Sequence, residues 1–297
     1  MPRGSLIRTL CIVSVLLLSS AIARAQGAPG TNLTVAVGVQ RIQIRGDTAF
    51  VQYIVRNSPR SAEELWNFTV SAPSRPLRVV RPQAHERWTT EVSAQGLQVA
   101  RWAVLGTHVA AGARTPTLEY SALGLPAMVT YWAGGYFPVP DYEPVDEDTL
   151  RAVTPQQALA ANAVVGQTVG VEPFPTDLSS ENLLARLRAL TDSACALGWI
   201  KERGACRELD EHLDQASREL QRGRREDARE HLREFIGDLR QRAGWRPEDD
   251  VEGHGWREDR DERQAAVNSS AYWLLTVNAD YLLTHLCEPG GPCREDR

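Results

Sequence analysis

The sequence predicts an all-β domain followed by an all-α domain: an immunoglobulin-like antiparallel β-sandwich and then an antiparallel four-helix bundle. Between Leu33 and Phe137, apolar residues alternate with period two in about eight short runs, separated by turns rich in Pro, Gly and Ser. From residue 179 onward, apolar residues instead recur at steps of three and four, the spacing of helices that bury one face. The 297 residues suffice for two ordinary domains.

The predicted sandwich spans residues 31–137. Its first alternation changes parity near Gln40–Arg41, which indicates a β-bulge. After a turn at Gly46, residues 49–55 (AFVQYIV) are apolar on both faces, as in a central strand. The pattern lacks the Cys…Trp…Cys arrangement of antibody domains, so it predicts an architecture only. Further strands are expected at 66–70, 77–81, 87–92, 97–105, 115–121 and 127–133.

Residues 138–178 are predicted to form a Pro-rich, acidic connector, within which Thr154 caps a short helix that begins at Pro155. The helical domain follows at 179–287, and 288–297 form a tail. Its central helices lie within 209–244 and are joined at Gly223, a residue suited to the left-handed conformation beyond a helix end. One helix precedes this pair and another covers 262–286, which makes four helices with short connections.

Residues 1–25 are typical of a cleaved signal peptide. Arg3 and Arg8 precede the apolar run 10–18, and Ala23-Arg24-Ala25 is an A-x-A cleavage motif. The apolar run is short for a bilayer span, which needs about 20 residues. We therefore expect a secreted or periplasmic protein without a membrane span; an uncleaved N-terminal tether is the alternative.

The charge pattern does not favour nucleic acid as a partner. The formal net charge is −5, and the predicted signal peptide holds three Arg and no acid, so the remainder carries −5 − 3 = −8. Arg residues are interleaved with Glu along the helices, as on a solvated, ion-paired face, whereas a phosphate-binding face needs clustered basic residues.

Four cysteines remain outside the predicted signal peptide, and an even number in an exported chain predicts two disulfides. We expect Cys195–Cys206 to join the end of one helix to the start of the next, and Cys287–Cys293 to close the loop between them. No Cys-x-x-Cys or Cys-x-x-His pair is present to hold zinc, so no metal or cofactor site is predicted.

Six aromatic residues of the sandwich raise the alternative of carbohydrate binding, because sugar rings stack on exposed flat rings. Trp66 and Trp102 are expected in the core, on alternating faces. Trp88, Trp132 and Tyr136 are the candidate ligand platform; Trp132 and Tyr136 flank Gly134-Gly135 and are expected at a rim.

No motif of a known catalytic centre is present: the sequence lacks G-x-S-x-G, H-E-x-x-H, a P-loop and G-x-G-x-x-G. His85 and His108 have no nucleophile and orienting acid beside them in sequence. We therefore expect no enzymatic activity. The alternative, a glycosidase-like hydrolase, would need two carboxylates about 5–10 Å apart in a cleft.

The helical half resembles the FIMAH-type domain of secreted bacterial proteins over about residues 168–286. The matching features are Gly198-Trp199-Ile200, the apolar run from Leu213 to Leu220, Gly223 followed by Ala228, Leu232 with Phe235-Ile236, and Asn278-Ala279-x-Tyr281-Leu282-Leu283. The resemblance implies a C-terminal accessory module of an exported protein and implies no catalytic residue. The sandwich shows no such resemblance.

Two polar features of the helical half have alternative interpretations. Residues 245–262 are acidic and include His254; they could hold a cation but fit no EF-hand spacing, and a solvated loop is favoured. Asn278 lies within an apolar stripe, where a buried amide bonded to backbone is favoured over a ligand contact.

The expected function is that of an exported, non-enzymatic interaction or accessory protein of the bacterial envelope or exterior. A polysaccharide-binding module that uses exposed aromatics of the sandwich is the alternative. The partner would then be a protein or a polysaccharide.

Overall fold

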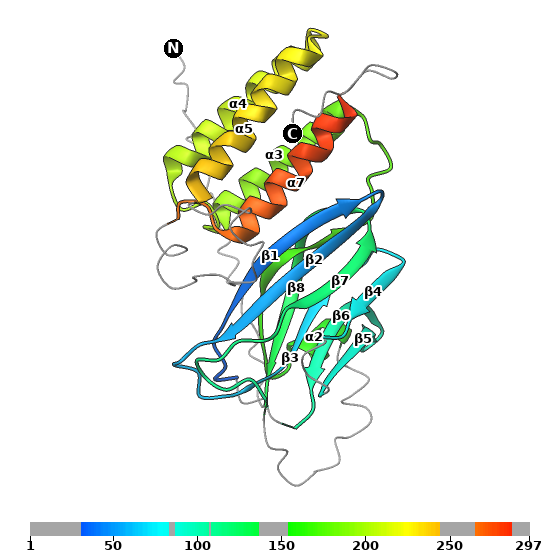
Figure 1. Ribbon diagram of the computed structural model, residues 1–297, viewed down its shortest axis with the longest axis vertical. Coiled ribbons are helices and arrows are strands. Elements are labelled where there is room, and N and C mark those ends of the chain that lie inside the picture. Colours follow the sequence, from blue (N-terminus) through cyan, green and yellow to red (C-terminus); the bar gives the residue numbers. More distant parts are fainter. Residues whose placement is uncertain (1–30, 83–86, 107, 137–153, 244–264, 287–297) are drawn as a thin grey trace, which may run out of the picture.

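A computed structural model describes residues 31–82, 87–106, 108–136, 154–243 and 265–286 (Figure 1). In these residues two antiparallel sheets are followed by a helical region, with its four main helices gathered on one side of the sandwich (Figure 1). The predicted fold class of a β-sandwich and a helical region is confirmed.

The sandwich consists of one four-stranded and one five-stranded sheet, with every pair of neighbouring strands antiparallel. The first sheet has the order β1 (Val35–Arg45), β2 (Thr48–Asn57), β7 (Leu118–Leu123) and β4 (Leu77–Val80). The second has the order β5 (Trp88–Ala94), β6 (Leu97–Val104), β3 (Leu65–Ser71), β8 (Leu125–Gly135) and β9 (Ala163–Glu172).

Several strand features predicted from periodicity are present in the sandwich. The pairing of β1 with β2 shifts register between Val39 and Arg41, at the predicted bulge. Strand β2 lies between β1 and β7, which is the central position predicted for it. Trp102 is fully buried, as expected, and its indole nitrogen donates to the carbonyl oxygen of Val80 at 3.0 Å.

Strand β9 corrects the predicted domain boundaries. It lies inside residues 138–178, which were predicted to be a connector, yet it pairs with β8 over its whole length. Val169 and Val171 are buried in the sandwich core. Gly166 and Gly170 interrupt the apolar alternation, which is why period-two analysis missed the strand. The sandwich is therefore completed by a strand that follows the short helix.

Four main helices form the helical region: α3 (Ser180–Ala196), α4 (Arg203–Gln221), α5 (Arg225–Ala243) and α7 (Ser269–His285). Helices α3 and α5 each contact both α4 and α7, so the four enclose one core. Helix α7 begins later than predicted because Asn268 caps it, accepting a hydrogen bond from the amide of Ala271. The predicted short helix is α2 (Pro155–Ala160), with Thr154 as its cap.

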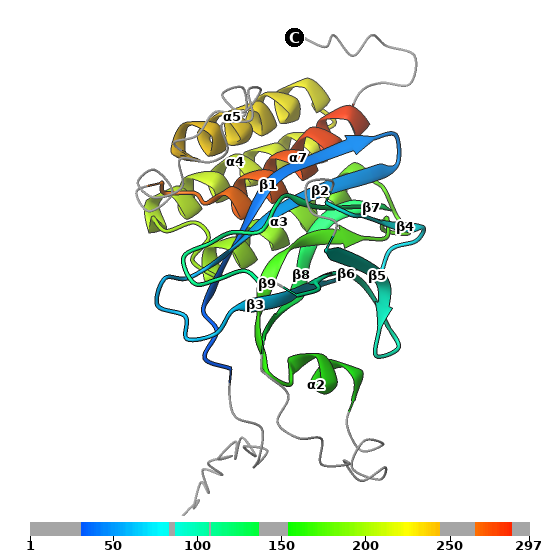
Figure 2. The same ribbon diagram turned by 60° about the horizontal axis from the view of Figure 1, so that its bottom comes forward.

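The helical region packs directly on the sandwich through α7, which contacts β1, β8 and β9. Figure 2 shows α7 alongside β1, with α2 on the opposite side of the sandwich. Two side chains of α7 donate to sandwich carbonyls: Trp273 Nε1 to Gln40 at 2.8 Å and Asn278 Nδ2 to Pro126 at 3.0 Å. Asn278 is 5% exposed, so the prediction of a buried amide bonded to backbone is confirmed.

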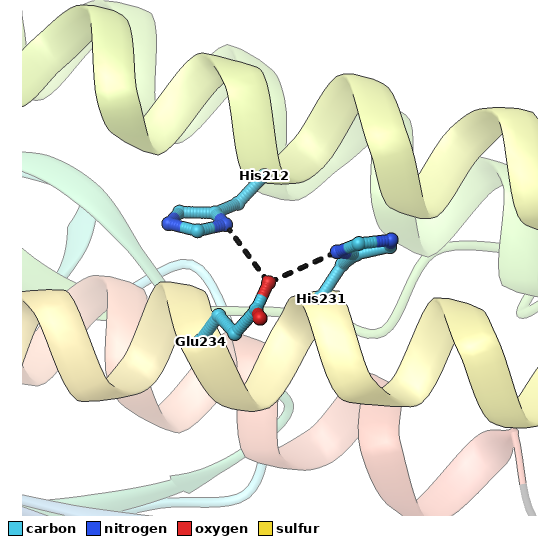
Figure 3. A group of neighbouring side chains, drawn as sticks. All are labelled: His212, His231 and Glu234. Atoms are coloured by element: carbon cyan, nitrogen blue, oxygen red, sulfur yellow. Dashed lines mark hydrogen bonds and ion pairs between the residues drawn. The ribbon is translucent and has the colours of Figure 1, made fainter.

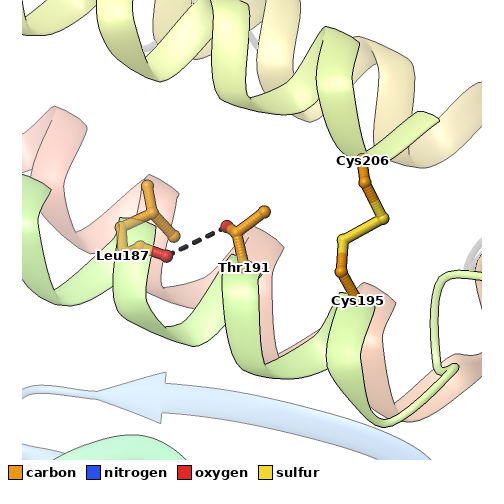
Figure 4. Close-up of a disulfide and its surroundings, with 4 residues drawn as sticks. All are labelled: Leu187, Thr191, Cys195 and Cys206. Atoms are coloured by element: carbon orange, nitrogen blue, oxygen red, sulfur yellow. Dashed lines mark hydrogen bonds between the residues drawn. A yellow bond between two sulfur atoms is a disulfide. The ribbon is translucent and has the colours of Figure 1, made fainter. Parts of the chain in front are cut away.

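The predicted disulfide Cys195–Cys206 joins the end of α3 to the start of α4 (Figure 4), with the Cα atoms 6.2 Å apart. Cys287, Cys293 and the loop 245–262 lie outside the described residues, as does the predicted signal peptide 1–25. Among the helices that the structure describes, none is long and apolar enough to cross a membrane.

Candidate functional site: a groove on the five-stranded sheet

A groove of about 770 Å³ lies on the outer face of the five-stranded sheet, between its strands and the segment around α2. This volume is within the range of pockets that hold small ligands. Its wall combines aromatic, charged and amide side chains with the backbone of two glycines. The lining includes Trp66, Asn67, Glu91, Arg101, Tyr136 and Asn162, with Gly134 and Gly135.

Trp66 is in the groove because of a local irregularity in β3. The pairing of β3 with β8 shifts register between Leu65 and Asn67, so Trp66 is the extra residue of a bulge. The inward-facing positions then become Leu65 and Phe68, both buried, while Trp66 is 37% exposed. The expectation that Trp66 lies in the core is therefore wrong, because strict alternation from Phe68 back to Trp66 does not hold across a bulge.

Arg101 connects the aromatic and charged parts of the groove. It alternates along β6 with the core residue Trp102, so its side chain is on the outer face. Its guanidinium carbon lies 5.8 Å from the Trp66 ring centroid, and its Nη1 is 2.9 Å from Glu91 Oε2. The Nε atom is buried and donates no hydrogen bond within the described residues. Arg101 thus places its charged group beside an exposed ring, while its Nε is covered.

Tyr136 stands at one end of the groove and is 41% exposed. Its ring stacks on the imidazole of His108, with the centroids 3.8 Å apart. Nδ1 of His108 lies 3.3 Å from Glu64 Oε2, and the backbone amide of Tyr136 donates to the Glu64 carbonyl at 2.7 Å. These contacts hold Tyr136 in place and give His108 a structural role. His85 lies outside the described residues.

The chemistry of the lining suits a neutral, hydroxyl-rich ligand. The amides of Asn67 and Asn162 offer donors and acceptors, and the charges of Arg101 and Glu91 offset each other. Among the lining residues that the structure describes, Glu91 is the only carboxylate. A glycosidase mechanism needs a second one across the groove.

The platform predicted from the sequence needs correction. Trp88 is 3% exposed and Trp132 is 5% exposed, so neither residue forms the exposed flat platform that was expected. Tyr136 alone of the three predicted residues is exposed, and it lines the groove with Trp66 rather than with the other two tryptophans. Trp66, Phe68 and Val70 alternate regularly in the sequence, without the change of parity that indicates the bulge in β1, so the bulge at Trp66 could not be predicted.

Comparisons with known proteins support the helical half of the prediction. Residues 184–248 match the model of the FIMAH domain, which confirms the resemblance over that range. No curated protein matches the chain. The chain thus combines a β-sandwich with a FIMAH domain.

Among solved structures, an uncharacterized protein from Nocardia farcinica with an immunoglobulin-like fold is similar at 14% identity and a TM-score of 0.25, over 45% of this chain and 95% of that one. The GH20 exo-β-N-acetylglucosaminidase of Vibrio harveyi is similar at 12% identity, as an inactive mutant and in complex with N-acetylglucosamine, with TM-scores of 0.23 and 0.22. Each of these covers 48% of this chain and 18% of that one. Likenesses this remote carry no argument about activity.

Proposed function

We propose that the protein is an exported, non-enzymatic accessory protein whose sandwich binds a polysaccharide in the groove beside Trp66. One observation carries this proposal: a bulge turns Trp66 outward, where its ring lies next to Arg101 in a groove that also exposes Tyr136. Aromatic rings provide a large contact area at a low entropic cost, and the surrounding polar groups can bond to hydroxyls.

The ion pair that Glu91 makes with Arg101 supports binding rather than catalysis. The lone carboxylate among the described lining residues is ion-paired with Arg101 instead of facing a second acid. An extracytoplasmic location is supported by the Cys195–Cys206 disulfide, since such bonds persist in oxidising compartments.

The proposal can be tested by sedimentation of the purified, oxidised protein with insoluble polysaccharides and cell-wall material. We expect retention on at least one matrix, and Trp66→Ala should weaken it at least tenfold, which is about 1.4 kcal/mol. The matched control is Val92→Ala, which removes an exposed apolar side chain from the same sheet outside the groove.

Equal retention of the wild type and Trp66→Ala would place any binding outside the groove. Absence of retention on every matrix would contradict polysaccharide binding and would favour a protein partner for the same accessory role. Circular dichroism of each variant checks that its fold is retained.

A further inference from the structure

Two histidines and a glutamate meet between α4 and α5, on a part of the molecule that the groove does not include. Figure 3 shows His212 of α4 facing His231 and Glu234 of α5, with both imidazoles directed at the same carboxylate. One ligand atom from each of the three residues lies within 4.8 Å of the others. The two histidine side chains are 22% and 25% exposed, so solvent reaches the cluster only in part.

The helix geometry explains how these residues come together. His231 and Glu234 are three residues apart, which puts them on one face of α5. Helices α4 and α5 are joined by residues 222–224, and this short connection brings α4 back alongside that face. The positions of the three ligands are therefore fixed by two long helices rather than by a loop.

When His212 is neutral, its contacts leave one of its ring nitrogens without a proper partner. Nδ1 lies 3.4 Å from Glu234 Oε2, and Nε2 lies 3.4 Å from Asp238 Oδ2. A neutral imidazole carries a single N–H, which can face only one of these two carboxylates. Within the described residues, Nδ1 is buried and makes no hydrogen bond. When the proton is on Nε2, the Nδ1 lone pair points toward a carboxylate oxygen that also carries lone pairs.

A cation between Nδ1 of His212 and Glu234 would remove this mismatch. His231 offers the third ligand, because its Nδ1 lies 3.0 Å from the same Glu234 oxygen. Asp238 would then accept a hydrogen bond from Nε2–H of His212, the arrangement in which a carboxylate orients a metal-bound imidazole.

We propose that His212, His231 and Glu234 form a binding site for a borderline divalent transition metal, with zinc as the best-matched ion. Two imidazole nitrogens and one carboxylate oxygen are ligands that such ions prefer, whereas magnesium and calcium prefer oxygen alone. Three protein ligands leave a fourth tetrahedral position for water or for a group of a partner. The bound ion links α4 to α5 within the FIMAH domain.

The test is a calorimetric titration of the full-length, tag-free, chelator-treated protein with zinc, together with the visible absorption spectrum of its cobalt complex. We expect one equivalent of zinc at the site, a rise in the unfolding temperature with zinc, and the intense cobalt bands of tetrahedral coordination. His231→Gln and Glu234→Gln should each raise the Kd at least tenfold and abolish the cobalt bands, while Asp238→Asn should raise the Kd about 10–100-fold.

His108→Gln is the matched control, because His108 also lies beside a glutamate but has no second histidine within the described residues. It should leave the zinc affinity unchanged. The proposal is overturned if no zinc binds at micromolar concentrations, or if the Kd and the cobalt spectrum are the same in His231→Gln and Glu234→Gln as in the wild type. Such persistent binding would assign the ion to another part of the chain.

Discussion

At the scale of single residues, Asp210 shows how packing opposes an ionised side chain. It lies on α4, is half-buried, and its Oδ1 makes no hydrogen bond within the described residues. Burial raises the pKa of its carboxyl group, and the nearby carboxylates of Asp192 and Asp214 raise it further, against the opposing effect of Arg188. Arg188 is itself ion-paired with Asp214. The folded protein therefore holds an Asp210 proton more tightly than the unfolded chain does.

From this shift we predict that Asp210→Asn stabilises the protein at neutral pH. Because the pKa is higher in the folded state, the wild-type free energy of unfolding falls as pH rises from the unfolded value of 3.8 through the folded value. Asparagine does not ionise, so the variant does not lose this stability. Its free energy of unfolding should exceed that of the wild type at pH 7 and should equal it below pH 3.8. Urea unfolding at both pH values measures it.

Glu211→Gln is the control for Asp210→Asn, since Glu211 is an exposed neighbour on the same helix. Its substitution should change the stability by less than about 0.5 kcal/mol. A destabilised Asp210→Asn variant at pH 7 would contradict the assigned direction of the pKa shift.

At the scale of elements, the turn between β7 and β8 illustrates a backbone constraint. Gly124 has a φ of +131° and donates its amide hydrogen to the Asp47 carbonyl at 3.0 Å. A Cβ atom at this position would lie 1.9 Å from the backbone oxygen of Glu172, at the end of β9. The turn is thus confined by two strand ends that are distant in sequence, and a side chain there cannot move the obstructing atom without moving the sheet.

We predict that Gly124→Ala destabilises the protein by more than 2 kcal/mol, because the strain of positive φ adds to a backbone collision. Gly46→Ala is the comparison, since Gly46 also has positive φ, at +59°, but open space around it. That substitution should cost only about 1–2 kcal/mol. Denaturant unfolding measures both variants. If they lose the same free energy of unfolding, the backbone has shifted to relieve the collision with β9, and the prediction is wrong.

At the scale of the whole molecule, the helical region and the sandwich share a buried interface. Asn278 is central to it, since its side-chain amide donates both to Pro126 of the sandwich and to Leu274 of its own helix. Arg186 of α3 donates to the same Pro126 carbonyl at 3.2 Å and lies 3.6 Å from Glu172. Hydrogen bonds as well as apolar contacts therefore join the two halves.

We predict that the two halves unfold in a single transition. Asn278→Ala should lower the free energy of unfolding by about 1–3 kcal/mol, the cost of leaving a buried carbonyl with fewer partners. Circular dichroism at the helical band reports mainly on the helical region, whereas tryptophan fluorescence reports on both halves, since four of the eight tryptophans lie in each. The two signals should give the same midpoint in the wild type and shift together in the variant. Gln221→Ala, at an exposed helix position, should shift neither. Two separate midpoints in the wild type would show that the interface does not couple the halves.

The sequence by itself determined the features that depend on local periodicity and local chemistry. The alternation of apolar residues predicted β1 with its bulge and β2 as a central strand, and steps of three and four predicted the four helices. The cap at Thr154 and the Cys195–Cys206 pairing also followed from neighbouring residues.

Only the tertiary structure decided the features that depend on contacts between distant segments. Strand β9 is defined by its pairing with β8, because its own residues show no clear alternation. Trp66 is turned outward by a bulge that involves a second strand, while Trp88 and Trp132 are covered. His212 meets His231 and Glu234 only once α4 and α5 lie side by side. A side chain's exposure and partners depend on what packs over it, and periodicity along one segment carries no information about that neighbour.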